Sequence, residues 1–236
     1  FATLARPTRM TRKSSPEQEW IAALPAYYGR RAPVYDEMWR RNDPVRLAEQ
    51  ARIAGALRAL FRGRRVLEVA CGTAYWTQFA AELAEHVCGI DASAEMLALA
   101  RQKGLPADKV ELREGNGYAL ADVPGTFNAG LANFWFSHVP KACLADFLAG
   151  FHRRVGPGAV VFMADNVYVP GLGGELVARP DCADTFKRRE LADGSQIEVL
   201  KNYYDAAQLR GIFEPLARDL TIQVGDCFWW ISYAVR

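Results

Sequence analysis

Two hydrophobic repeats alternate along the middle of this chain. Short apolar runs with the length and β-branched content of strands occur at residues 65–70, 87–90, 110–113, 127–133 and 159–164. Segments with helical spacing of apolar positions separate most of them, at residues 74–85, 94–102 and 141–153. Strands that alternate with helices predict a doubly wound α/β fold, in which helices cover both faces of a mostly parallel sheet.

The segment before this core has a helical pattern. A first helix is expected from Ser15 until Pro25, and residues 26–39 form an aromatic-rich second segment broken by Gly29 and Pro33. Residues 45–61 predict a long amphipathic helix. Together these helices are expected to form a lid.

The segment after the core differs again. Residues 167–183 are rich in Gly and Pro, and the Asp193-Gly194 pair between extended runs at 185–191 and 196–204 predicts an inserted β-hairpin. Residues 205–213 predict a helix, and residues 220–224 and 228–235 an antiparallel strand pair, which completes seven strands.

These patterns divide the chain into a tail and one domain. We expect residues 1–14 to be a disordered tail or a non-native remnant. The single domain is expected to span residues 15–236, with a lid at 15–62, a ligand-binding core at 63–166, the insertion and hairpin at 167–204 and a C-terminal helix and strand pair at 205–236.

Composition narrows the class of partner. Lys and Arg number 29 against 27 Asp and Glu, and the cationic excess lies within the first thirteen residues, so nucleic-acid binding, which needs clustered cations, is not predicted. No apolar run approaches the roughly 20 residues that span a bilayer, so no membrane association is predicted. Five widely spaced cysteines without a CxxC pair indicate neither disulfides nor a metal site, and favour a cytoplasmic location.

The first candidate ligand site follows the first strand. Residues 66–77, VLEVACGTAYWT, form a strand, a turn at Gly72 and the start of a helix. A dinucleotide site would show GxGxxG, and the single glycine here weakens the case for a pyrophosphate. Glu68 could instead contribute to the electrostatic field that attracts the ammonium group of a ligand with an amino-acid head. An ordinary tight turn is the alternative.

Two further polar sites follow the next strands. Asp91 ends the second strand, where a carboxylate can accept both hydroxyls of a ribose; its alternative role is to cap the next helix. Asn116 and Gly117 follow the third strand, where an amide oxygen and a backbone N–H could meet the edge of an adenine. Gly-Asn-Gly is also ordinary turn chemistry.

In their order and spacing, VLEVACGTAYWT, GIDASAEML, REGNGYAL, LANFWFSHVP and RVGPGAVVFMADN resemble the motifs of class I S-adenosylmethionine-dependent methyltransferases, over residues 66–166. The flanks YYGRRAPVYD and ELADGSQIEVLKNYY are similar to those of small bacterial natural-product methyltransferases, including O-methyltransferases of small acids such as phosphonates. The resemblance implies S-adenosylmethionine as cofactor and S-adenosylhomocysteine as product.

The resemblance also implies roles for individual residues. The expected cofactor-binding residues are Tyr28, Glu68, Ala70, Gly72, Trp76, Asp91, Ala92, Met96, Asn116, Gly117 and Asn133. Two positions depart from the family pattern, since Ala74 replaces a frequent glycine and Asn116 a usual aspartate. Ala adds one methyl group and Asn keeps an acceptor oxygen, so we expect adjusted rather than abolished cofactor binding.

The methyl acceptor is expected to lie outside the core motifs. We predict contacts from aromatic and basic residues, namely Tyr27, Arg31, Tyr35, Trp39, Trp135, Arg188, Arg189 and Lys201. Simple packing of the aromatics and solvated hairpin charges are the alternatives. His138 is the candidate general base, or else a residue that only holds its loop.

The predicted function is methyl transfer to a small molecule, most simply O-methylation, driven mainly by alignment of the reacting atoms. Three alternatives stay open: an N-methyltransferase for an amine or heterocycle, a non-catalytic cofactor-binding module, and a dehydrogenase on the same fold. The acceptor and the oligomeric state are not specified by the sequence.

Overall fold

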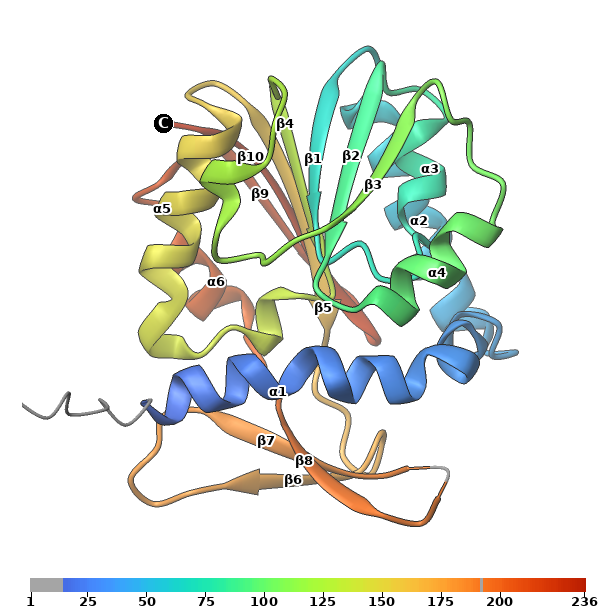
Figure 1. The fold of residues 1–236 in the computed structure, drawn as a ribbon. Coiled ribbons are helices and arrows are strands. Elements are labelled where there is room, and N and C mark those ends of the chain that lie inside the picture. Colours follow the sequence, from blue (N-terminus) through green and yellow to red (C-terminus); the bar gives the residue numbers. More distant parts are fainter. Residues whose placement is uncertain (1–14, 192) are drawn as a thin grey trace, which may run out of the picture.

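A twisted seven-stranded sheet forms the centre of the computed structural model, which describes residues 15–191 and 193–236 (Figure 1). Its strands run in the order β3-β2-β1-β4-β5-β10-β9. Their bounds are β1 Arg65–Val69, β2 His86–Asp91, β3 Val110–Glu114, β4 Ala129–Asn133, β5 Val160–Asn166, β9 Ala217–Val224 and β10 Phe228–Val235. Within this sheet β10 alone runs opposite to the other strands, which confirms the predicted mostly parallel doubly wound sheet.

Helices cover both faces of this sheet. On one side in Figure 1 lie α2 (Pro44–Leu60), α3 (Thr77–Ala81) and α4 (Ala94–Gln102), and on the other α5 (Leu144–Val155) and α6 (Ala206–Phe213). Because side chains alternate along a strand, β1 sends Leu67 and Val69 into the α5–α6 core and Val66 into the α2–α3 core. Both layers are therefore built on the predicted strand run.

A second, three-stranded sheet lies beyond the carboxyl ends of the parallel strands, and α1 (Pro16–Arg31) runs between the two sheets (Figure 1). Its strands are β6 (Glu175–Ala178), β7 (Thr185–Glu190) and β8 (Gln196–Leu200). The β7–β8 pair is the hairpin predicted from Asp193-Gly194. Strand β6 was not predicted, because residues 167–183 carry more turn signals than strand signals.

The lid differs from its prediction in one respect. Helix α1 continues through Pro25 and Gly29 to Arg31, and a 3-10 helix, η1 (Ala32–Trp39), follows it. The predicted break at Pro25 is wrong because packing on both sides holds the helix: Leu24 and Tyr27 are buried against Val199 of β8. A Cβ on Gly29 would lie 2.7 Å from a Glu95 carboxylate oxygen on α4, so the helix also approaches the core closely there.

Two predicted core helices are also shorter than expected. The segment 74–85 contains only α3, because Ala74, like Gly72, has a positive φ and the chain turns until Trp76. The segment 141–153 begins with a 3-10 turn, η4 (Lys141–Cys143), before α5. Two more 3-10 turns, η2 (Leu120–Asp122) and η3 (Phe136–His138), follow β3 and β4. Residues 1–14, predicted as a tail, lie outside the described part.

No helix within residues 15–191 and 193–236 combines the length and apolarity needed to cross a bilayer.

Candidate active site

The turn after β1 has an unusual backbone. Ala70, Gly72 and Ala74 all have φ between 55° and 61°, the left-handed region that costs a non-glycine residue roughly 1–2 kcal/mol. Phe134, just after the neighbouring strand β4, has φ 58°. Three strained non-glycine residues at the carboxyl ends of adjacent strands mark a functional site, since such strain is retained where the surrounding structure enforces it.

Asp91 ties this turn to the second strand. Its Oδ2 accepts the Gly72 N–H at 2.8 Å and its Oδ1 accepts the Ser93 N–H at 2.8 Å. Burial raises the pKa of Asp91, and the backbone hydrogen bonds oppose this shift. A carboxylate has about four acceptor sites, so Asp91 keeps acceptor capacity beyond these backbone N–H groups, and a ribose hydroxyl can still bind there. The capping role falls to Ser93, whose Oγ accepts the Met96 N–H at 3.3 Å.

The turn after β3 leaves no room for a side chain at Gly117. A Cβ there would lie 2.9 Å from Val69 and 3.2 Å from the Trp135 ring, so glycine keeps this edge open. Asn116 accepts the Tyr118 N–H through Oδ1 at 2.9 Å. An adenine amino group that donates to Asn116, as predicted, would therefore share Oδ1 with the Tyr118 N–H.

A cavity of about 680 Å³ joins these turns beneath α1. Twelve of the predicted residues line it: Tyr28, Tyr35, Ala70, Gly72, Asp91, Ala92, Met96, Asn116, Gly117, Asn133, Trp135 and His138. The sequence did not point to its remaining apolar walls, which include Ile21 and Pro25 of α1 and Phe147 of α5. These residues carry no chemical signal, and only the packing of α1 over the sheet brings them here.

A second cavity of about 20 Å³ lies beside the first and shares Tyr35, Ala70, Gly72, Asn133 and Phe134 with it. Its lining also includes Trp39, Glu68 and Trp76. Trp39 packs edge-on against Trp76, with ring centroids 5.2 Å apart, and is buried in the α2–α3 core. Trp39 therefore does not line the larger cavity, although it was predicted to contact the methyl acceptor.

Unpaired buried polar atoms gather around this smaller cavity. Among the described residues they include the Glu68 Oε2, both amide atoms of Asn133 and the indole nitrogens of Trp39 and Trp76. Burial raises the pKa of Glu68 to about 8. An amino-acid head group needs carboxylate and amide acceptors for its ammonium and N–H donors for its carboxylate. These residues fit the methionine end of S-adenosylmethionine.

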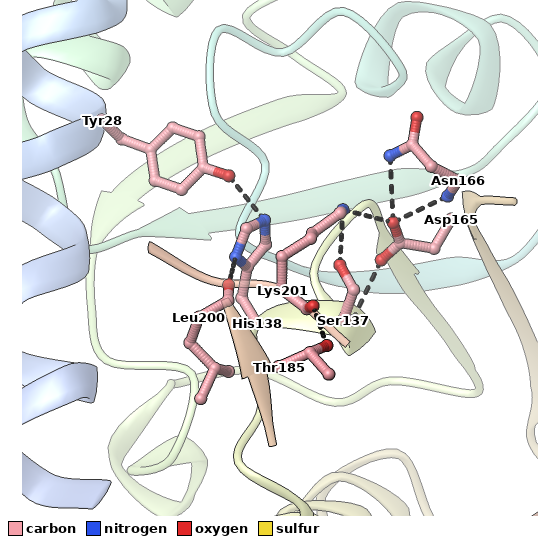
Figure 2. Close-up of polar contacts among 8 residues, drawn as sticks. All are labelled: Tyr28, Ser137, His138, Asp165, Asn166, Thr185, Leu200 and Lys201. Atoms are coloured by element: carbon pink, nitrogen blue, oxygen red, sulfur yellow. Dashed lines mark hydrogen bonds and ion pairs between the residues drawn. The ribbon is translucent and has the colours of Figure 1, made fainter. Parts of the chain in front are cut away.

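His138 lies at the opposite wall of the larger cavity, where α1 meets η3 (Figure 2). Its Nδ1 bonds the Leu200 carbonyl oxygen at 2.7 Å, and its Nε2 bonds the Tyr28 hydroxyl at 2.6 Å. Burial lowers the pKa of His138 to about 3, and the Lys201 ammonium acts in the same direction. The ring is therefore neutral at physiological pH.

A buried ion pair lies next to His138. Lys201 donates to Asp165 Oδ1 at 2.8 Å and to Ser137 Oγ at 2.6 Å, while Asp165 Oδ2 accepts the Ser137 N–H (Figure 2). Both members of the pair are at most 5% exposed, so Lys201 is bound to the protein and does not line the cavity. The sequence analysis missed Asp165 and Ser137; an acid at the end of β5 was the available signal.

Side-chain alternation separates the basic residues of β7. Arg188 lies on the face where it pairs with Glu175 at 2.6 Å and Glu198 at 2.9 Å, which is the solvated arrangement considered as an alternative. Arg189 points to the other face and acts electrostatically on Tyr28 and His138. The structure thus separates two arginines that the sequence treated alike.

Arg31 stands on the lid beside the same tyrosines. It donates to the Tyr27 hydroxyl at 2.9 Å and lies over the rings of Tyr27 and Tyr35, at 5.6 and 5.9 Å. Tyr27 itself is buried against β8. Within the described ranges no carboxylate forms an ion pair with Arg31 or Arg189, and neither arginine lines the larger cavity directly.

No group of three metal-binding side chains occurs in the described part of the chain, and its five cysteines are unpaired.

Comparisons with known proteins define the class. Residues 66–158 match the family model for a methyltransferase domain. The demethylmenaquinone methyltransferase of Lysinibacillus sphaericus is 35% identical over 102 residues, covering 42% of this chain and 43% of that protein. The malonyl-[acyl-carrier protein] O-methyltransferase of Pectobacterium atrosepticum is 31% identical over 147 residues, covering 60% and 52%. The chain thus spans about half the length of these curated relatives.

Solved structures match over more of the chain. The DhpI–SAH complex is 28% identical with a TM-score of 0.72, covering 92% of this chain and 98% of that one, and the DhpI–SAM–HEP complex has a TM-score of 0.71. CalS10 of Micromonospora echinaspora, an amino pentose methyltransferase, is 21% identical with a TM-score of 0.57 and shares the fold. The chain carries a methyltransferase domain, and its predicted place among the S-adenosylmethionine-dependent methyltransferases is confirmed.

Proposed function

We propose that this protein transfers the methyl group of S-adenosylmethionine to an oxygen of a small anionic molecule, such as a carboxylic or phosphonic acid. The observation that carries the proposal is the pair of guanidinium groups, Arg31 and Arg189, that flank Tyr28 and Tyr35 without a carboxylate partner in the described residues. Partly buried cations without counter-ions favour an anionic ligand, because charge-assisted hydrogen bonds are the strong ones.

The cofactor would occupy the edge formed by β1, β2 and β4. Asp91 would hold the ribose, Gly117 would admit the adenine edge, and Glu68 with Asn133 would receive the amino-acid head. When bound, the cofactor supplies an activated methyl group on a sulfonium. The lid residues Tyr28 and Tyr35 line the cavity beside this edge, where their rings would shield the bound cofactor from water.

Two relatives are compatible with the proposal. The Pectobacterium relative is named as an O-methyltransferase, and the DhpI complex contains HEP together with SAM. An N-methyltransferase is the second candidate, favoured by Asp146, an exposed carboxylate on the wall of the larger cavity that could attract a cationic amine. A cytoplasmic location, which the unpaired cysteines favour, is part of the same proposal.

The test is a methyl-transfer assay with labelled S-adenosylmethionine against matched panels of small acids, amines and phenols. We expect labelled methyl esters from acids, with a strong loss in Arg189→Ala and little change in Arg188→Ala. If labelled amines are the main products, the proposed O-methyltransferase is wrong and the N-methyltransferase is supported. Binding of S-adenosylhomocysteine without turnover of any panel would favour the non-catalytic module.

A further inference from the structure

The proton on each nitrogen of His138 can be assigned from its partners. A backbone carbonyl only accepts, so the Nδ1 at 2.7 Å from the Leu200 oxygen carries the proton. In a neutral ring Nε2 then has a lone pair and no hydrogen. The Tyr28 hydroxyl lies 2.6 Å from Nε2, the contact drawn as a dashed line in Figure 2, and must therefore donate to it. The Nε2 lone pair, which a general base would use, already accepts the hydrogen bond of the Tyr28 hydroxyl.

This assignment also fixes the character of the Tyr28 oxygen. A tyrosine has one hydroxyl proton, and here it is committed to His138. Burial raises the pKa of Tyr28 well above 10, so the hydroxyl stays neutral. What Tyr28 presents to the larger cavity, which it lines, is an oxygen that accepts hydrogen bonds and donates none.

The charged and titratable neighbours of the His138–Tyr28 pair offer no free base in its place. They come from α1, η1, β5, β7 and the segment after β8: Tyr27, Arg31, Tyr35, Asp165, Arg189 and Lys201. Asp165 is the one carboxylate among them, and Lys201, the Ser137 N–H and Asn166 saturate it. Asp146 lines the cavity elsewhere, on α5, and is tested separately below.

We infer that His138 is a positioning residue, which holds the Tyr28 hydroxyl as a pure acceptor facing the cavity, so that the methyl acceptor must arrive already ionised. This rests on the proposed function. An anionic oxygen is repelled by the Tyr28 oxygen and attracted by Arg31 and Arg189, and the two effects together orient the acid. Its charged end lies towards the arginines, and a C–H or donor group lies towards Tyr28.

The reaction balances without a base. The attacking carboxylate or phosphonate oxygen gains the methyl group, and the electron pair of the broken S–CH3 bond stays on sulfur. The negative charge of the acid and the positive charge of the sulfonium cancel, so no proton has to leave. A neutral phenol or an ammonium would have to lose a proton, and the His138–Tyr28 pair cannot take it.

The direct test is nitrogen NMR of His138 in the wild-type protein with S-adenosylhomocysteine. We expect the Nδ1-protonated neutral tautomer, unchanged between pH 5.5 and 8. A His138 resonance that titrates between pH 6 and 7 overturns the inference. This readout does not depend on turnover, so it stands or falls separately from the proposed function.

The kinetic test compares His138→Gln with His138→Ala on a small acid. Gln can place an amide oxygen to accept from Tyr28 but cannot act as a base. We expect His138→Gln to keep kcat within 10-fold of wild type with a flat pH profile, and His138→Ala to lose more. Loss of a general base would lower kcat about 100- to 10,000-fold in both variants, and that result would contradict the inference.

One control and one further test complete the design. His152 also bonds a tyrosine hydroxyl, that of Tyr233 at 2.8 Å, but does not line the cavity, so His152→Gln should leave the pH profile unchanged. Asp146→Asn is a second test, because Asp146 is the exposed carboxylate on the cavity wall. A loss of more than 10-fold in Asp146→Asn would show that this carboxylate acts as the base, and would overturn the claim that the acceptor arrives ionised.

Discussion

The two sides of the cavity are built in different ways. The cofactor side comes from one continuous stretch, residues 66–133, and leaves several buried polar atoms of Glu68 and Asn133 without partners. The acceptor side combines α1 with β7, β8 and η3, and at its centre the buried Lys201–Asp165–Ser137 cluster is held by hydrogen bonds among its own members. One side leaves polar atoms free for a ligand of fixed structure. The other side is part of the internal framework, and Arg31 and Arg189 lie beside its tyrosines without a carboxylate partner in the described residues.

The largest expected effect comes from breaking that framework. Lys201→Ala would leave the fully buried Asp165 carboxylate unpaired, and we expect the free energy of unfolding to fall by about 3–5 kcal/mol. The measurement is chemical denaturation. Arg188→Ala, which removes a solvated pair on the outer face of the same sheet, is the control and should cost less than about 1 kcal/mol. Equal losses would show that the acceptor side is not integral to the fold.

On the cofactor side the expected loss is in binding. Asp91→Ala should weaken S-adenosylhomocysteine binding by about 1.5–3 kcal/mol, because charge-assisted bonds to the ribose disappear. Asp91→Asn keeps one acceptor oxygen and should lose less. Calorimetric titration measures both. Unchanged affinity in Asp91→Ala would mean that the ribose lies elsewhere.

Glu68 links stability to pH. Its folded pKa of about 8 exceeds the ordinary 4.5, so between these values the folded state holds a proton that the unfolded state has released. Stability therefore falls as pH rises through this window. Glu68→Gln has no such loss and should be more stable than wild type by at least about 1 kcal/mol at pH 8, with a smaller gap at pH 5.

Thermal and chemical denaturation across this pH range measure the effect. The same substitution should weaken binding of the cofactor's ammonium end, so saturating S-adenosylhomocysteine should reduce or reverse the gap. A gap that is independent of pH would contradict the assigned ionisation of Glu68.

The smallest expected effect is at Ala74. Glycine would relieve its positive φ, but it would also remove a buried methyl group and add chain entropy to the unfolded state, and these terms of about 1 kcal/mol each nearly cancel. We expect Ala74→Gly to change stability by less than about 0.5 kcal/mol. The exposed mid-helix control Ala98→Gly should cost about 1 kcal/mol. Equal costs in a denaturation experiment would show that Ala74 is unstrained.

The same contrast explains what could be predicted from sequence. Strand and helix periodicity, the turn at Gly72 and the acid at Asp91 are local features of the chain, so the sheet and the cofactor edge followed from them. Arg188 and Arg189 are equivalent in sequence, and only the pairing of β7 with β8 decides which one faces α1. The partners of His138 and Lys201 lie more than 30 residues away in the sequence, and no local pattern predicts them.

Helix α1 gives the same lesson. Pro25 and Gly29 are breakers by local propensity, yet the helix continues because it packs against β8 on one side and against α4 on the other. The stabilisation from tertiary burial therefore exceeds the cost of a proline inside a helix, which is about 3 kcal/mol. Trp39 was misplaced for a related reason, since an aromatic residue on a lid can face either the cavity or the core.

The central claim is that the acceptor side selects an anion through Arg189. The most direct measurement is kcat/KM for a small acid and for its uncharged amide, in wild type, Arg189→Ala and Arg188→Ala. We expect that wild type prefers the acid, that Arg189→Ala loses at least about 10-fold on the acid alone, and that Arg188→Ala stays within twofold. Equal losses in the two arginine variants, or a wild-type enzyme indifferent to the charge of its substrate, would contradict it.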